Sequence, residues 1–222
     1  MIFHDREDAG RQLAQQLTDY ANSPAVVVLG IPRGGVPVAF EIAAALRAPL
    51  DIFLSCKLGV PGQEELAFGA ISAGDVRFLD QQRIESTRIS EEEVSRITQS
   101  ARDKLEERAR LYRVGRPPLQ LKGRTVILVD DGIATGASVY VAILALRQRN
   151  PSKLVLAIPV APASTASRIR SAPDELVVLD TPSSFHAVGQ FYNNFSQVSD
   201  NQVIDLLRRA NKLHPFSDLV QG

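Results

Sequence analysis

The residues best suited to chemistry lie in one stretch, VILVDDGIATGAS, which spans Val126–Ser138. Its continuous apolar run predicts a strand buried on both faces, and two adjacent carboxylates, Asp130 and Asp131, follow where the run ends. The loop after them consists mainly of small residues, so a ligand can approach its backbone closely. Backbone N–H groups in such a loop, together with the start of the next helix, favour a bound anion such as a phosphate.

The two acids need a different partner, because carboxylates repel a phosphate. A pair of sugar hydroxyls or a metal ion would satisfy Asp130 and Asp131, while Thr135 and Ser138 can add hydroxyl donors to the phosphate. This combination predicts a phosphorylated sugar, with its phosphate in the loop and its ribose hydroxyls on the acids. The structural alternative is an ordinary strand–turn–helix connection with an exposed Asp-Asp-Gly turn.

A second glycine-containing turn, LGIPRGGV at Leu29–Val36, follows the apolar run Ala25–Leu29. Arg33 supplies a positive charge and a fork of N–H donors. Gly34 and Gly35 let backbone amides turn toward ligand oxygens without a clash from a Cβ atom. The structural alternative is a tight turn between a strand and a helix.

The first stretch resembles the phosphoribosyl-pyrophosphate-binding signature of the type I phosphoribosyltransferases, which is a hydrophobic strand, two acids and a small Thr-Gly loop. The resemblance implies that Asp130 and Asp131 bind the ribose 2′- and 3′-hydroxyls and that Asp131 belongs to the catalytic set. It also implies a 5′-phosphate loop made of Ala134, Thr135, Gly136, Ala137 and Ser138.

The second turn resembles the pyrophosphate loop of the same family, which often contains a cis peptide bond that does not precede a proline. The resemblance implies that Arg33, Gly34 and Gly35 bind pyrophosphate, with Arg33 in the catalytic set. It predicts a cis bond between Pro32 and Arg33.

Lys57 follows the apolar run Leu50–Leu54 and matches a basic residue of the family that reaches the pyrophosphate. The resemblance implies that Lys57 joins Arg33 in neutralising the leaving group and counts as catalytic. A solvated lysine is the structural alternative.

The activity implied by the resemblance is transfer of the 5-phosphoribosyl group from phosphoribosyl pyrophosphate to a nitrogenous base, with release of pyrophosphate. The partners are then phosphoribosyl pyrophosphate and an unidentified base, and Mg²⁺ bridges substrate oxygens while keeping several waters. No dense protein metal site is expected, because the chain has no zinc-type Cys/His spacing. The alternative function is a phosphoribosyl-pyrophosphate sensor or regulatory protein without catalysis.

One departure concerns the acceptor. The 6-oxopurine members of the family carry a further aspartate where this chain has Ala134. The departure disfavours hypoxanthine, guanine and xanthine as acceptors.

The elements that position these loops alternate between apolar strands and helices. This order predicts an α/β protein with a mostly parallel sheet flanked by helices, whose site lies beyond the carboxyl ends of the strands, near a switch in strand order. The expected strands are Ala25–Leu29, Leu50–Leu54, Arg124–Val129, Leu154–Val160 and Glu175–Leu179. The expected helices are Asp5–Tyr20, Val38–Arg47, Ser90–Tyr112, Ala137–Gln148, Ser164–Ser171 and Gln202–Asn211.

We expect one phosphoribosyltransferase-like domain over residues 1–222, with an insert at about 57–115. Scattered glycines in the first part of the insert predict loop and irregular β structure. The segment Gly59–Leu79 is therefore a candidate lid with glycine hinges. Glu64 and Glu65 are candidate acid–base groups within it, although simple solvation is the favoured interpretation.

The later part of the insert predicts a long charged helix. The SEEE pattern at Ser90–Glu93 fits a capping box, and the apolar stripe that follows must be buried somewhere. Packing on the hood or a homodimer contact would each bury it. Five arginines of this region, at positions 102, 108, 110, 113 and 116, could add a phosphate-facing patch, although solvated charges are the favoured interpretation.

A small hood is expected from about residues 181–200 together with the chain ends. Its segment PSSFHAVGQFYNNF, at Pro182–Phe195, loosely resembles the hood of the purine members, where a phenylalanine stacks on the base. Phe185 is the candidate base contact. The alternative places Phe191, Tyr192 and Phe195 in the core.

Composition excludes several classes of partner. The formal net charge is zero, so neither a nucleic acid nor a membrane is expected as a partner held by bulk electrostatics. A single cysteine, Cys56, and a beginning without a signal-peptide pattern favour the cytoplasm. The Walker A pattern of P-loop proteins is absent, as is a helix-turn-helix pattern.

Overall fold

The computed structural model describes residues 1–72, 76–112 and 120–215, without the side chains of residues 64, 65 and 76. These residues form two compact units. The first contains the described residues of Met1–Phe53, Pro117–Gly136 and Asn150–Gly222, and the second contains those of Leu54–Arg116 and Ala137–Arg149. The first boundary, at Leu54, lies close to the expected start of the insert near residue 57.

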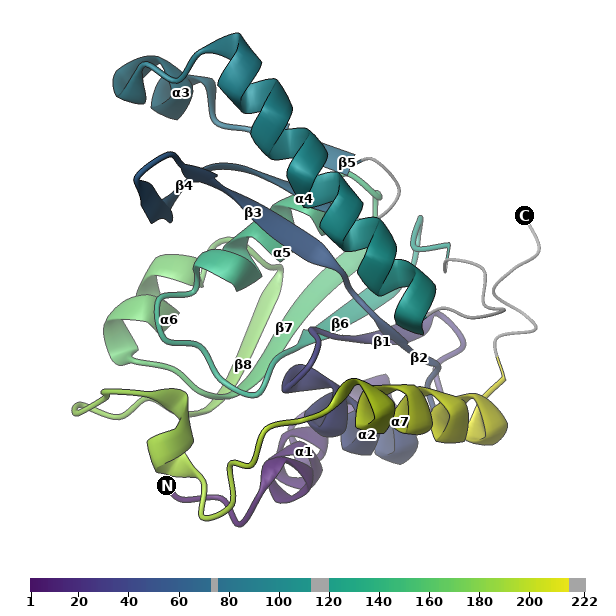
Figure 1. Cartoon of the computed structure of the whole chain (residues 1–222). Helices are drawn as coiled ribbons and strands as arrows, with labels where there is room; N and C mark the ends of the chain where they lie inside the picture. Colours follow the sequence, from purple (N-terminus) through teal and green to yellow (C-terminus); the bar gives the residue numbers. More distant parts are fainter. Residues whose placement is uncertain (73–75, 113–119, 216–222) are drawn as a thin grey trace. The chain divides into compact units, whose positions relative to one another are not determined.

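The first unit is built on a parallel five-stranded sheet with the order β2-β1-β6-β7-β8 (Figure 1). The central strands are almost wholly buried, as their runs of valine, leucine and isoleucine predicted. The expectation of an α/β protein with a mostly parallel sheet is confirmed. The strands are β1 (Val26–Gly30), β2 (Leu50–Ile52), β6 (Thr125–Val129), β7 (Lys153–Val160) and β8 (Glu175–Asp180).

The order of the strands reverses between β1 and β6. The chain leaves β1 for β2 on one side and later enters β6 on the other side of β1. The register pairs Gly30 with Val129, so the two strands end at the same level. The loops that follow these strands therefore leave the carboxyl edge of the sheet side by side, which is where open α/β sheets bind ligands.

Three helices of the first unit, α1, α2 and α7, pack on one another and on strands of the sheet (Figure 1). Helix α2 begins at Gly35, earlier than expected, because the glycine loop itself forms the first turn. Pro37 lies in that turn, where its missing N–H has no intrahelical partner to lose. The helices of this unit are α1 (Arg6–Gln15), α2 (Gly35–Leu46), α6 (Ala163–Ile169) and α7 (Asp200–Leu213), with 3-10 turns η1 (Thr18–Tyr20) and η2 (Val188–Phe191).

The second unit contains an antiparallel sheet of order β3-β4-β5, where loop and irregular β structure had been expected. The predicted irregular β structure is confirmed, whereas the predicted loop is wrong, because the glycines of this segment serve the sheet. Gly59 lies at an irregularity in the β3–β4 register, and a Cβ atom at Gly69 would lie 2.5 Å from the carbonyl oxygen of Phe78. Gly74, one of the expected hinge glycines of the candidate lid, falls outside the described residues. The strands are β3 (Ser55–Val60), β4 (Gln63–Ser72) and β5 (Val76–Leu79).

Helix α4 (Glu91–Tyr112) begins with the predicted capping box. The Glu93 N–H donates to Ser90 Oγ at 3.2 Å, and the Ser90 N–H donates to Glu93 Oε2 at 3.1 Å. The buried stripe of this helix includes Ala101 and Leu105, and the helix contacts β3 and β4. The stripe is thus buried within its own unit, and neither a hood contact nor a dimer is needed to cover it.

The remaining helices of this unit are α3 (Gln81–Thr87) and α5 (Ala137–Arg147). Helix α3 was not predicted, because its sequence QQRIEST has no periodic apolar stripe. Of the five arginines assigned to solvent, Arg108 and Arg110 are exposed and Arg102 is half-buried, whereas positions 113 and 116 fall outside the described residues. Among the residues described, no helix is both long enough and apolar enough to cross a membrane.

Candidate functional site

The two predicted loops contact each other directly at the switch point of the sheet. The Ile31 N–H donates to the Val129 carbonyl at 2.9 Å. Beyond that bond, a Cβ atom at Gly34 would lie 2.0 Å from Asp131 Oδ2, and a Cβ at Gly35 would lie 2.6 Å from the Val129 oxygen. The two glycines are required because the first loop passes directly over the acids that end β6.

Within the first loop, the peptide bond between Pro32 and Arg33 is cis, which confirms the prediction. The Gly35 N–H donates to the Ile31 carbonyl at 3.0 Å and closes the turn. The Arg33 guanidinium lies 3.8 Å from the carboxylate of Asp200 at the start of α7, and its side chain is 40% exposed. The loop thus presents an accessible cation beside the paired acids.

The acids themselves are held in a buried environment. The Asp131 N–H donates to Asp130 Oδ1 at 2.9 Å. Burial, together with the neighbouring Asp131 charge, raises the pKa of Asp130 well above its usual value. Burial also raises the pKa of Asp131, although its hydrogen bond to Arg6 opposes this shift. Two such acids favour a ligand that donates hydrogen bonds to them, as sugar hydroxyls do.

Arg6 is a member of the site that the sequence analysis missed. Its Nε donates to Asp131 Oδ2 at 2.7 Å, and the two side chains are only 11% and 14% exposed. Because 125 positions separate the partners, no local pattern links them. One signal was present: an arginine in the first turn of a helix opposes the helix dipole and so suggests an acidic partner elsewhere.

The loop after the acids is supported from behind by helix α6. Thr165 Oγ1 donates to the Ala134 carbonyl at 2.8 Å, and the Arg168 guanidinium donates to the Thr135 carbonyl. In a trans peptide the C=O and the N–H point in opposite directions. Turning these two carbonyls toward α6 therefore turns the N–H groups of Thr135 and Gly136 away from it. Ala134 and Thr135 are exposed, so a ligand can reach this side.

Three of the predicted site residues belong to the second unit. Lys57 lies in β3, half-buried, rather than in a loop after a strand. Ala137 and Ser138 are the first two residues of α5, and Ser138 is exposed. The predicted acid–base candidates Glu64 and Glu65 lie in β4, but their side chains fall outside the description.

The expected hood segment is joined to the beginning of the chain. The Phe3 N–H donates to the Phe191 carbonyl at 2.8 Å, and the Asn193 N–H donates to the Phe3 carbonyl at 2.9 Å. The Phe185 ring stacks on Phe191 with centroids 5.3 Å apart, so one of its faces is already covered. Tyr192 reaches the site, because its hydroxyl donates to the Asp131 carbonyl at 2.6 Å.

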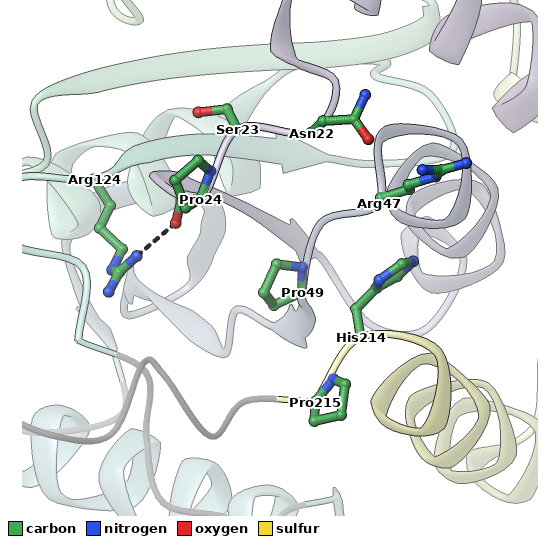
Figure 2. Close-up of a pocket in the computed structure, with 8 residues that line it drawn as sticks. All are labelled: Asn22, Ser23, Pro24, Arg47, Pro49, Arg124, His214 and Pro215. Atoms are coloured by element: carbon green, nitrogen blue, oxygen red, sulfur yellow. Dashed lines mark hydrogen bonds between the residues drawn. The ribbon is translucent and has the colours of Figure 1, made fainter.

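A hollow lies at the opposite edge of the parallel sheet from these loops, before the starts of β1, β2 and β6 (Figure 2). It has a volume of about 500 Å³. Its basic residues have structural roles: Arg124 donates to the Pro24 carbonyl at 2.9 Å, while the backbone N–H groups of Arg47 and His214 donate to carbonyls at the carboxyl ends of α2 and α7. The lining residues are Asn22, Ser23, Pro24, Arg47, Pro49, Arg124, His214 and Pro215.

Comparison with known proteins identifies the family. Residues 2–195 match the family described as the phosphoribosyl transferase domain, and the chain belongs to this family. Two curated proteins from strains of Mycobacterium tuberculosis, assigned by name to the phosphoribosyl transferases, are each 47% identical over 211 residues. Each match covers 95% of this chain but 47% of the relative, so the chain spans about half the length of these relatives.

Solved structures with a similar fold are also found. TT1426 from Thermus thermophilus is 40% identical and superposes with a TM-score of 0.86, covering 94% of this chain and 99% of that one. AQ2163 from Aquifex aeolicus is 16% identical, with a TM-score of 0.52 over 83% of this chain and 78% of that one. The second likeness concerns the fold alone.

Proposed function

We propose that this protein transfers the 5-phosphoribosyl group from phosphoribosyl pyrophosphate to a nitrogenous base and releases pyrophosphate. The observation that carries the proposal is the direct contact between the PRGG loop and the acid pair at the switch point. A substrate that carries a pyrophosphate at C1 and hydroxyls at C2 and C3 needs anion-binding and hydroxyl-binding groups at this close spacing.

In this proposal each end of the sugar has its own binding group. Asp130 and Asp131 accept hydrogen bonds from the 2′- and 3′-hydroxyls. The 5′-phosphate binds to the loop whose carbonyls are turned toward α6, through the N–H groups on its other side. That loop consists of Ala134, Thr135, Gly136, Ala137 and Ser138. Support for the phosphate site comes from the bonds of Thr165 and Arg168, which orient two of its peptides.

The chemical step breaks the bond between C1 and the pyrophosphate oxygen and forms a bond between C1 and a nitrogen of the base, which loses a proton. Positive charge develops on the sugar while negative charge leaves with the pyrophosphate. Arg33, the amides at Gly34 and Gly35, and Lys57 stabilise the leaving group, and the Asp131 carboxylate stabilises the sugar. The contribution of the protein is therefore positioning and electrostatic stabilisation.

We propose Mg²⁺ as the cofactor, held mainly by pyrophosphate and ribose oxygens. The residues at this place fit such an ion, because the PRGG loop lies against the carboxylates of Asp130 and Asp131 and Mg²⁺ prefers oxygen ligands. Mg²⁺ prefers to keep several waters and to bind substrate phosphates rather than a protein cage. When bound, the ion would neutralise charge on the leaving pyrophosphate.

The acceptor base is proposed to lie against the hood, with Phe185 as its stacking residue. One face of that ring packs on Phe191, and the side chain as a whole is only half-buried. A base stacked on the remaining surface would gain from the π-face contact. Ala134, which takes the place of an acid in the 6-oxopurine members, supports an acceptor outside that group.

Phosphorus NMR of the protein with phosphoribosyl pyrophosphate and Mg²⁺ tests this function. Purines, pyrimidines and simple amines are added in turn, and release of pyrophosphate that depends on one of them supports a transferase and identifies its acceptor. Line broadening without turnover for the whole panel contradicts catalysis and supports the sensor function. Unperturbed spectra overturn the sugar site, and the double variant of Asp130 and Asp131 to asparagine is the matched negative control.

A further inference from the structure

Arg6 makes three contacts that join separate parts of the first unit. Its Nε donates to Asp131 Oδ2 at 2.7 Å, and its Nη1 donates to the Ser196 carbonyl at 2.8 Å. The guanidinium carbon lies 3.9 Å from the centroid of the Phe195 ring, within cation–π distance. One side chain therefore links the acid that ends β6 with the hood segment.

The backbone that carries Arg6 is itself fixed at this place. Asp5 caps helix α1 by accepting from the Asp8 N–H at 2.8 Å. On the other side, the Asn194 N–H donates to the His4 carbonyl at 2.9 Å. Arg6 is thus held between a capped helix and the hood segment, so its guanidinium has little freedom to leave Asp131.

We propose that Arg6 is a positioning residue for sugar binding: it fixes one oxygen of Asp131, leaves the other to a sugar hydroxyl, and links that acid to the hood over the acceptor. This inference rests on the proposed phosphoribosyl transfer. Arg6 acts through Asp131 and through Ser196 rather than on the reacting atoms. The role would make occupancy of the sugar site and the geometry of the hood depend on each other.

The charges around the acids give Arg6 a second effect that can be measured. The groups facing Asp131 are the Arg6 guanidinium from α1, the Asp130 carboxyl from the same loop, and the Tyr192 hydroxyl from the hood. Burial and the nearby Asp131 charge raise the pKa of Tyr192, so this hydroxyl stays neutral. Arg6 lowers the pKa of Asp131, and to a smaller extent that of Asp130, against the effect of burial. Removing its charge should therefore let both acids protonate at higher pH.

The test compares Arg6→Gln, which keeps N–H donors but removes the charge, with Arg6→Lys, which keeps the charge but removes the fork. Carbon-13 NMR follows the Asp131 carboxyl through a pH titration of the ligand-free protein. Calorimetry follows binding of phosphoribosyl pyrophosphate with Mg²⁺ over the same range. For Arg6→Gln we expect the pH midpoint of the Asp131 carboxyl titration to rise by about one pH unit, and the pH below which binding is lost to rise by the same amount. On the acidic side of the binding curve, this shift corresponds to about a tenfold loss of affinity at a given pH. Arg6→Lys should keep both near the wild-type values.

Arg11→Gln is the matched control. Arg11 lies on the same helix, pairs with Glu7 and Glu41 at 4.0 and 3.8 Å, and is 54% exposed. It should change neither the titration nor the binding limit. If Arg6→Gln behaves like this control while remaining folded, Arg6 is only a structural link and the inference is overturned.

A measurement on the wild-type chain keeps the inference testable if Arg6→Gln does not fold. The Nε–H proton of Arg6 should shift with the same pH midpoint as the Asp131 carboxyl and should shift again when phosphoribosyl pyrophosphate is added. An Nε–H signal that does not follow the carboxyl overturns the link. If wild-type protein binds no phosphoribosyl pyrophosphate at any pH, the proposed function fails, while the ligand-free titration still decides whether Arg6 controls Asp131.

Discussion

At the scale of single residues, the two adjacent acids differ in what stabilises them. Asp131 has the Arg6 guanidinium at 2.7 Å. Asp130 accepts the N–H of its neighbour and lies beside a second negative charge, and burial raises its pKa furthest above the usual value. The same sequence pattern, Asp-Asp, therefore contains one acid paired with a cation and one whose ionisation is unfavourable without a ligand.

Asp130→Asn should stabilise the ligand-free protein at neutral pH. A carboxyl whose pKa is raised by folding contributes stability that is present below its unfolded pKa and is lost as the pH rises through its folded pKa. Asparagine removes this loss and still accepts the Asp131 N–H through its Oδ1. We expect Tm to rise by about 2–4 °C at pH 7, equivalent to about 1 kcal/mol, with no rise below about pH 4. Thermal unfolding at both pH values measures the effect, and a lower Tm at pH 7 would contradict it.

Asp131→Asn should not stabilise the protein in this way, although burial also raises the pKa of Asp131. It leaves the Arg6 guanidinium, only 11% exposed, without its anionic partner, which should cost about 1–3 kcal/mol. Both asparagine variants should lose binding of phosphoribosyl pyrophosphate. Glu7→Gln is the control, because its exposed pair with Arg11 at 4.0 Å should be worth less than about 1 kcal/mol. Equal Tm changes for Asp130→Asn and Asp131→Asn would refute the difference between the acids.

Arg33→Ala should reduce turnover more than it reduces binding of ribose 5-phosphate, which has no pyrophosphate. Arg33 is accessible and lies 3.8 Å from Asp200, so a substrate pyrophosphate can compete for it. The comparison is between steady-state rates with phosphoribosyl pyrophosphate and calorimetric affinity for ribose 5-phosphate. Turnover that survives the substitution would remove Arg33 from the pyrophosphate loop.

At the scale of elements, the short helix α6 orients the loop that follows the acid pair. Its Thr165 and Arg168 side chains bind the carbonyls of Ala134 and Thr135, so the helix sets the direction in which the neighbouring amides point. The proposed phosphate loop is thus defined by two elements, the loop itself and the helix behind it.

Thr165→Val should weaken phosphate binding while leaving the packing volume almost unchanged. It removes the hydroxyl that holds the Ala134 carbonyl at 2.8 Å, a bond worth about 0.5–1.5 kcal/mol. We expect affinity for ribose 5-phosphate to fall by about 2- to 10-fold, measured by calorimetry. Ser164→Ala, at an exposed position on the same helix, is the control. A loss of affinity for the control equal to that for Thr165→Val would argue against orientation by α6.

At the scale of the whole molecule, the site loops follow two neighbouring strands whose order reverses between them. A ligand that joins these loops binds the folded chain and not the unfolded one, so it should stabilise the whole first unit. At 100 times its dissociation constant, phosphoribosyl pyrophosphate should add about 2.7 kcal/mol, or roughly 5–10 °C in Tm. Thermal unfolding with and without ligand measures this, and the shift should vanish in Asp130→Asn. A shift that persists in that variant would place the ligand elsewhere.

Much of the fold and of the site could be predicted because the signals are local. The apolar runs of β1, β6 and β7 specify buried strands by composition, and Ser90 with Glu93 specifies a helix start within four residues. The cis bond before Arg33 was expected from the resemblance of the PRGG turn to the family's pyrophosphate loop. Strands β3 to β5 could not be predicted in the same way. Scattered glycines are typical of a loop in the sequence, and only the pairing with a neighbouring strand shows that the segment forms a sheet.

What the sequence by itself determined is the set of chemical groups and the loops that carry them: Asp130, Asp131, the Thr-Gly loop and Arg33 with its glycines. Only the tertiary structure decided which groups contact one another. It placed Gly34 against Asp131, α6 behind the loop that contains Ala134 and Thr135, and Arg6 on Asp131 from 125 positions away. The physical reason is that hydrogen bonds and charges act over a few ångströms of space, whereas sequence patterns report only on residues that are close along the chain.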